Sequence, residues 1–158
     1  MTSEQPIDPP TVGWTARLRA LLVHAVAIAL GLAFAWIGLL HFRNPEPFEA
    51  IVPAYLGWPR FWNFTSGGLE IVLGLGLLVP RTRRWSARLL VFLVLAMSLA
   101  NLNMWINDLP FNGTRLSTRG HLIRGAIQVV LLGVLAWFGW RRRTTAPAAI
   151  KTEAIRAW

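Results

Sequence analysis

The sequence predicts an all-α polytopic membrane protein: a four-transmembrane-helix bundle with a short interfacial helix after the first span. Hydrophobic residues make up 54% of the 158 residues, and charged residues make up only 15%. The charges gather between four apolar runs, each close to the roughly 20 residues that cross a hydrocarbon core. Because apolar residues are continuous within each run, the spans are expected to be helices and not barrel strands.

The four spans are expected at about residues 20–42, 59–80, 86–106 and 121–140. Pro59 suits the first turn of a helix, and Pro80 suits a stop. The first loop, residues 43–58, contains a short run between Pro47 and Pro53 that allows only about two helical turns. We expect that run to form a short interfacial helix or a re-entrant cap over the mouth of the bundle.

The ends of the chain differ in composition from the spans. Residues 1–16 are polar and contain prolines, and residues 144–158 show no apolar pattern. We interpret both segments as flexible cytoplasmic tails on either side of a membrane domain of residues 17–143. The first apolar run is too long for the apolar region of a secretory signal, so we expect it to be retained.

Basic residues predict the orientation of the spans. An even number of spans places both termini on one side, and cytoplasmic segments are enriched in Lys and Arg. The two tails and the middle loop contain most of these residues, whereas the other two loops contain Arg43, Arg60, Arg115 and Arg119. Both termini are therefore expected in the cytoplasm.

The net charge of +9 is accounted for by arginines that flank the spans, so the expected partner is the lipid bilayer and not nucleic acid. The chain contains no cysteine. This excludes disulfides, CxxC redox pairs, thiolate zinc sites and cysteine-ligated iron–sulfur clusters. No metal site is expected and no cofactor motif is present, so a redox role would need a bound cofactor or a partner.

One carboxylate, Glu70, lies inside an apolar run, roughly 16 Å from Pro59 along the helix. A lone ionisable group at that depth costs about 3 kcal/mol on insertion scales. In one interpretation, Glu70 accepts a proton or orients a ligand in a cavity open to the outer face. In the other, it is protonated, or paired with Arg124 or an asparagine, and locks helix packing. Ser66, Gly67 and Gly74 form a small-residue face around it.

Other polar side chains gather in the outer half of the predicted bundle. His41, at the outer mouth of the first span, is either a ligand group or an interfacial histidine bonded to the neighbouring loop. Arg124 and Gln128 share one helix face with His121. Arg124 either snorkels outward or reaches inward to an anion or to Glu70, and Gln128 either bonds to a neighbouring helix or contacts a ligand.

Asn101 and Asn103 are two residues apart and point to different faces of the third span. We expect at most one of them to face the interior and the other to bond locally.

His24 is interpreted as a packed or lipid-interface histidine, and the glycosylation sequons at Asn63 and Asn112 as chance matches. The sequence contains no nucleophile–base pair, no phosphate-cradling glycine loop and no cluster of residues with metal-ligand spacing. The chain is therefore not expected to be an enzyme by itself.

Three segments together resemble the DoxX-like family of small four-span bacterial membrane proteins. They are Gly38-Leu-Leu-His-Phe-Arg-Asn-Pro-Glu-Pro-Phe48 with Ile51-Val-Pro53, Ser66-Gly-Gly-Leu-Glu-Ile through Pro80-Arg-Thr-Arg, and Ala100-Asn-Leu-Asn-Met104. The resemblance covers about residues 30–128. The matching residues are His41, Phe42, Pro45, Pro53, Gly67, Glu70, Gly74, Pro80, Arg83 and Asn101.

The resemblance implies a four-helix bundle in the bacterial cytoplasmic membrane. Some members of the family are linked to quinone-dependent sulfur oxidation and others to membrane-associated redox-stress complexes. A quinone-like ligand and a membrane or soluble redox partner are thus expectations from the family. Where relatives often carry an Arg-Leu-Pro-Leu-Gln segment before the fourth span, this chain has Arg115-Leu-Ser-Thr-Arg119.

Three functions follow as hypotheses. The leading one is an accessory membrane protein whose outer-facing polar pocket, with Glu70, His41, Asn101 and Arg124, binds a small molecule or a partner protein. The second is a membrane subunit of a quinone-linked oxidoreductase, which needs a cofactor-bearing partner. The third is a proton-coupled small-molecule transporter, which Glu70 permits.

Overall fold

The computed structural model describes residues 13–141, and this part of the chain is helical. Its elements are α1 (Trp14–Arg43), α2 (Glu46–Glu49), the 3-10 helix η1 (Ala54–Leu56), α3 (Pro59–Leu78), α4 (Arg83–Ile106) and α5 (Thr118–Trp140). Four of these helices are long and apolar enough to cross a membrane. Within residues 13–141 the extended pairing is limited to an isolated bridge in the loop after α4. The prediction of an all-α, four-helix, multi-pass membrane protein is confirmed.

The helix ends differ from the predicted ones for local reasons. α1 begins at Trp14, so residues 14–16 of the predicted tail 1–16 are helical. α3 ends at Leu78 because Val79, which precedes a proline, is extended. α5 begins at Thr118, where the Ser117 side chain accepts a hydrogen bond from the Gly120 amide. The remainder of the N-terminal tail and the whole predicted tail 144–158 lie outside the described residues.

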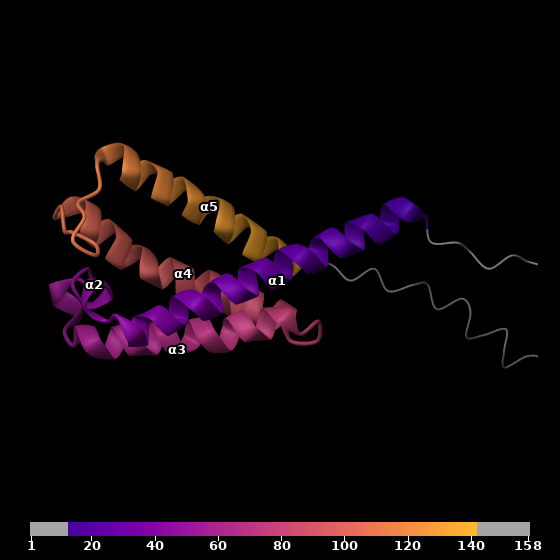
Figure 1. Ribbon diagram of the computed structural model, residues 1–158, viewed down its shortest axis with the longest axis horizontal. Helices are drawn as coiled ribbons and strands as arrows, with labels where there is room; N and C mark the ends of the chain where they lie inside the picture. The colour runs from indigo at the N-terminus through magenta and orange to yellow at the C-terminus, as the bar shows by residue number, and fades with distance from the viewer. Residues whose placement is uncertain (1–12, 142–158) are drawn as a thin grey trace, which may run out of the picture.

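The first loop contains the expected short helix, but it is shorter than predicted. α2 makes a single turn, and the chain then bends through Pro53 into η1. A proline restricts the residue before it to extended conformations, which stops α2 from continuing. Together, α2 and η1 form one end of the molecule with the loop of residues 107–117, and we refer to this end as the cap end (Figure 1).

The four long helices form two pairs, α1 with α3 and α4 with α5, and the link between the pairs is the packing of α3 on α4. Figure 1 shows α5 diverging from α1 and α3 toward the cap end, while the first turns of α1 project beyond the opposite end. That opposite end contains Pro80–Arg84 and Gly139–Arg141, and we refer to it as the arginine end. Near it the pairs converge on a core that includes Ala27, Leu77, Leu90, Leu135 and Phe138.

Glycines bring α1 and α3 into backbone contact. A Cβ atom at Gly74 would lie 2.7 Å from the Gly31 carbonyl oxygen, and one at Gly38 would lie 2.6 Å from the Gly67 carbonyl oxygen. No side chain larger than hydrogen fits at these crossings without moving a helix. In lipid, where apolar burial does not drive helix association, such close backbone packing is a main source of stability.

Three arginines bond to helix ends at the arginine end. Nε of Arg83 donates to the Leu77 carbonyl oxygen at 2.7 Å, at the C-terminus of α3. Nε of Arg84 and Nε of Arg88 donate to the Gly139 carbonyl oxygen at 3.0 and 2.9 Å, near the C-terminus of α5. The last carbonyl groups of a helix have no partner within it, so these bonds satisfy groups that would otherwise lack one. The sequence interpretation of these arginines as orientation charges was therefore incomplete.

The glycine crossing predicts a difference between two substitutions in the same helix. Gly74→Ala adds a methyl group against the backbone of α1 and should lower the free energy of unfolding by about 1–3 kcal/mol. Gly68→Ala adds the same group where, apart from the backbone of its own helix and its chain neighbours, no atom lies within 4 Å. It should be neutral or slightly stabilising, because alanine has the higher helix propensity. Thermal unfolding in mild detergent measures both, and equal losses would contradict the packing described.

Candidate functional site

A cavity of about 680 Å³ lies at the cap end, between the two helix pairs. All four long helices contribute to its walls, and the segment from Phe48 to Leu56 covers its end. Most of the lining is apolar, as in the majority of small-molecule sites. Two lining residues, Ile37 of α1 and Ile127 of α5, are 41% and 63% exposed, so the cavity also reaches the lipid-facing surface.

One polar cluster on the α1–α3 wall comprises His41, Asn63 and Glu70, and we call it the His41 cluster. All three side chains are buried, with 2% of Glu70 and 3% of His41 exposed. Nδ1 of His41 lies 2.6 Å from Oδ1 of Asn63, and Nδ2 of Asn63 donates to the His41 carbonyl oxygen at 3.1 Å. The second bond orients the amide, so Nδ1 of His41 is the donor in the first.

This arrangement leaves Nε2 of His41 facing Oε2 of Glu70 at 3.2 Å. The two atoms are within ion-pair distance of each other. Neither atom has a hydrogen bond of good geometry within residues 13–141. Both residues line the cavity, although these two atoms face each other and are themselves buried.

The ring of Phe48 covers His41 from the cap side. The two rings are stacked, with centroids 3.9 Å apart and an angle of 27° between their planes. Phe48 belongs to α2, so the short helix holds a lid against the His41 cluster. Phe111, from the loop after α4, packs edge-on against Phe48 and ties the lid to the other half of the molecule.

The second polar cluster lies on the α4–α5 wall and comprises Ser98, Asn101, Arg124 and Gln128; we call it the Arg124 cluster. Arg124 NH2 donates to Oδ1 of Asn101 at 2.6 Å, and Nδ2 of Asn101 donates to Oε1 of Gln128 at 2.8 Å. Nε2 of Gln128 bonds in turn to the Ser98 hydroxyl. These bonds form one chain across the two helices.

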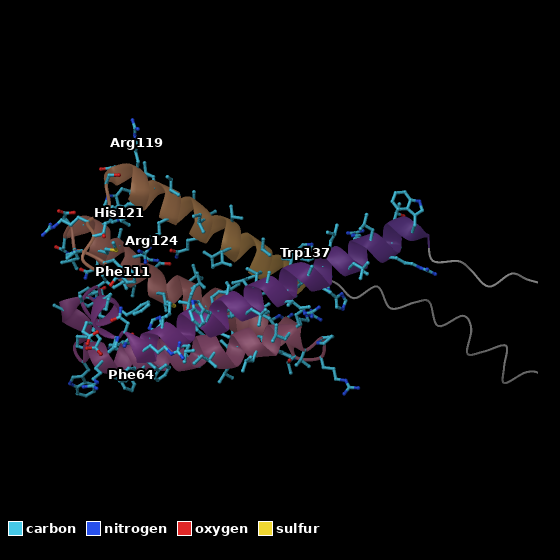
Figure 2. The ribbon with its side chains drawn as sticks, in the orientation of Figure 1. Phe64, Phe111, Arg119, His121, Arg124 and Trp137 are labelled. Carbon is cyan, nitrogen blue, oxygen red and sulfur yellow. The ribbon has the colours of Figure 1, made fainter. Side chains whose placement is uncertain are left out.

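Arg124 points into the molecule, unlike its neighbour on the same helix. Figure 2 shows Arg119 extending away from the bundle, whereas Arg124 lies toward the cap-end interior above Phe111. The guanidinium carbon is 5.4 Å from the centre of the Phe111 ring. Among residues 13–141 no carboxylate lies within ion-pair distance of Arg124. Its positive charge therefore faces the cavity without a counter-ion from that part of the chain.

The structure brings together most of the predicted site residues, but with different partners. Glu70 is paired with His41, so the alternative in which it pairs with Arg124 or an asparagine does not hold. Asn101, Arg124 and Gln128 meet on the opposite wall. His121 shares their helix but stacks on Trp105, with ring centroids 5.6 Å apart, and does not line the cavity.

Asn103 makes the expected local bond and a second, longer-range one. Oδ1 of Asn103 accepts a local hydrogen bond from Nδ2 of Asn107 at 2.8 Å, as expected, but Nδ2 of Asn103 also donates to the Ile51 carbonyl oxygen at 2.9 Å and so holds the segment after α2. His24 is exposed and bonds to the Ala20 carbonyl oxygen, far from the cavity. Within residues 13–141 no group of three or more His, Asp or Glu side chains is arranged to hold a metal ion.

Asn63 is the residue that sequence reasoning missed. It was interpreted as part of a chance sequon, but it is fully buried and orients His41. A signal was present, because Asn63, Gly67 and Glu70 have i, i+4, i+7 spacing and so share one helix face. Two polar residues on the small-residue face of a span indicate a buried polar pair.

Comparison with protein families gives one match. A family described as "Domain of unknown function (DUF8561)" matches residues 30–139. The chain belongs to this family. The DUF8561 region contains every residue that lines the cap-end cavity, from Phe34 to Leu131. Comparison with curated proteins and with solved structures found no match.

The hydrogen bond between His41 and Asn63 predicts a specific effect of removing the Asn63 amide. Asn63→Ala leaves Nδ1 of His41 buried without an acceptor, which costs about 1–3 kcal/mol of stability. Asn107→Ala is the matched control, because Asn107 is exposed and bonds only within its own helix end. Unfolding in detergent should show a clear loss for the first variant and little change for the second. Similar values for both would contradict an orienting role for Asn63.

Proposed function

We propose that this protein is a DoxX-like accessory membrane protein that binds a quinone-like small molecule in the cap-end cavity. The observation that carries the proposal is the presence of two separate polar clusters on opposite walls of one apolar cavity. A ligand that suits this arrangement is largely apolar and carries oxygen atoms at two edges.

A quinone has this form: a flat apolar ring with a carbonyl oxygen at each of two opposite edges. Arg124 and the amide of Asn101 supply hydrogen-bond donors for one oxygen. A proton on Nε2 of His41 or on Oε2 of Glu70 supplies a donor for the other oxygen, once that side chain turns from its partner toward the cavity. Charge-assisted hydrogen bonds of this kind are about twice as strong as neutral ones, which suits a site with few polar groups.

The route to the cavity also supports a lipid-soluble ligand. Ile37 and Ile127 line the cavity and are exposed on the surface that faces hydrocarbon in a bilayer. An apolar tail on the ligand can therefore remain among lipid chains while the ring lies between the clusters. A water-soluble substrate would gain nothing from this opening.

Orientation and location are part of the same proposal. Basic residues are concentrated in the tails and the arginine end, so the positive-inside rule supports cytoplasmic termini with the cap end on the outer side. The resemblance to the DoxX-like family supports the bacterial cytoplasmic membrane. The sequence encodes no redox motif, so an accessory role beside a cofactor-bearing partner is preferred to catalysis by this chain.

The test uses decylubiquinone as the probe and decylbenzene, which has the same tail and no carbonyl oxygens, as the control compound. Decylubiquinone should raise the melting temperature of the detergent-purified protein, and decylbenzene should not. Glu70→Gln and Arg124→Gln should each weaken binding by about tenfold or more, the effect of losing a hydrogen bond to a charged group.

Two variants serve as matched controls for the same changes. Glu46→Gln and Arg119→Gln alter exposed residues that do not line the cavity, and both should bind decylubiquinone like the wild type. If Glu70→Gln and Arg124→Gln lower the melting temperature of the empty protein but leave decylubiquinone affinity unchanged, the clusters serve helix packing alone.

A further inference from the structure

A second cavity lies at the arginine end, remote from the cap-end cavity and independent of the function proposed for it. Its volume is about 170 Å³, compared with about 30 Å³ for one water in the liquid. It therefore has room for a group of several heavy atoms, such as a phosphate with its oxygens. Its lining comes from α1, the α3–α4 loop, the start of α4 and the end of α5: His24, Pro80, Arg83, Arg84, Phe138 and Arg141.

The lining is strongly basic. Three guanidinium groups and an imidazole meet there, and Arg83 lies close enough to Arg141 for their charges to repel. The acidic residues within residues 13–141 all lie elsewhere, since Glu70 is in the His41 cluster and the others belong to the cap end: Glu46, Glu49 and Asp108. That part of the chain supplies no counter-ion to this cavity.

The arginines are held in place and yet keep free donors. Arg83 and Arg84 are fixed by their bonds to the carbonyl oxygens of Leu77 and Gly139. Arg141 lies over the rings of Trp137 and Phe138, 5.0 and 5.6 Å from their centres. Within residues 13–141, the NH1 and NH2 groups of Arg84 and the whole guanidinium of Arg141 have no hydrogen-bond partner. Fixed, unpaired guanidinium groups match the tetrahedral oxygens of a phosphate.

The depth of the cavity corresponds to the phosphate level of a bilayer. His24 and Arg43 of α1 lie about 29 Å apart along the helix, close to the thickness of a hydrocarbon core. If Arg43 marks one boundary, His24 marks the other. Trp85 and Trp140 are 65% and 49% exposed at this end, as expected for side chains in the interfacial belt, and Figure 2 shows Trp137 there as well.

From these observations we infer that the arginine-end cavity is a binding site for the phosphate of an anionic phospholipid. The headgroup phosphate accepts hydrogen bonds from Arg84 and Arg141, and the acyl chains lie along the apolar helix surface. A basic pocket between transmembrane helices at the interface is a suitable receptor for an anionic headgroup. If the arginines were general surface charges alone, Arg81, which is exposed in the α3–α4 loop and does not line the cavity, would matter as much as Arg141.

The experiment measures lipid binding to the delipidated, detergent-purified full chain by native mass spectrometry and by melting temperature. Dioleoyl phosphatidylglycerol should bind and raise the melting temperature, whereas dioleoyl phosphatidylcholine, whose phosphate is neutralised by its own cation, should bind about tenfold more weakly. Arg141→Gln should lower phosphatidylglycerol affinity about tenfold, and adding Arg84→Gln should abolish the preference.

Arg81→Gln is the control, because it removes the same charge from the same end of the molecule; it should bind phosphatidylglycerol like the wild type. Arg141 makes no side-chain hydrogen bond within residues 13–141, so its variant should fold normally. Equal binding of the two lipids, an unaffected Arg141→Gln variant, or an equal loss in Arg81→Gln would overturn the inference. Stabilisation by inorganic phosphate that competes with phosphatidylglycerol would overturn the lipid assignment in favour of a free phosphate.

Discussion

The contact between α1 and α3 at their glycines is the constraint on which the rest of the structure depends. At the Gly38–Gly67 crossing the two backbones are so close that a Cβ atom at Gly67 would lie 2.5 Å from Cβ of His41. His41 is therefore pressed against α3, where Asn63 and Glu70 are the polar groups within its reach. A wider spacing of these helices would separate the histidine from the carboxylate and leave two unpaired polar groups in the membrane, each of them costly.

The same packing explains why the cap-end cavity is larger than the cavity at the arginine end. α1 and α3 form one unit, α4 and α5 form a second, and the units converge where Leu77, Leu90, Leu135 and Phe138 interlock. Toward the cap end the units diverge, and the segment that contains α2 and η1 closes the space between them. The hydrogen bond from Asn103 to Ile51 and the aromatic contacts of Phe48 hold that closure. Each wall thus brings its own polar cluster, already bonded within its helix pair.

The architecture was predictable because continuous apolar runs and prolines determine it almost without regard to tertiary contacts. Glu70 and His41 were identifiable for a similar reason, since polar residues in apolar runs stand out. Their partners were not identifiable, because helix pairing depends on crossings such as Gly31 with Gly74, and nothing local specifies which helix a glycine meets. Asn63 was not identified as a site residue, because its position in a glycosylation sequon offered another explanation for it. The hydrogen bond of Arg83 to the end of α3 was not predictable, because membrane topology alone already accounts for a basic residue after a span.

The stacking of Phe48 on His41 separates two routes by which a molecule can reach the centre of the protein. From the aqueous side, entry requires α2 to swing away, which breaks the aromatic contact and exposes a buried polar pair. From the bilayer, entry past Ile37 and Ile127 disturbs neither. A molecule that entered by the second route would do so in proportion to its concentration in the membrane, so partitioning into lipid would select among solutes before any hydrogen bond to the clusters was made.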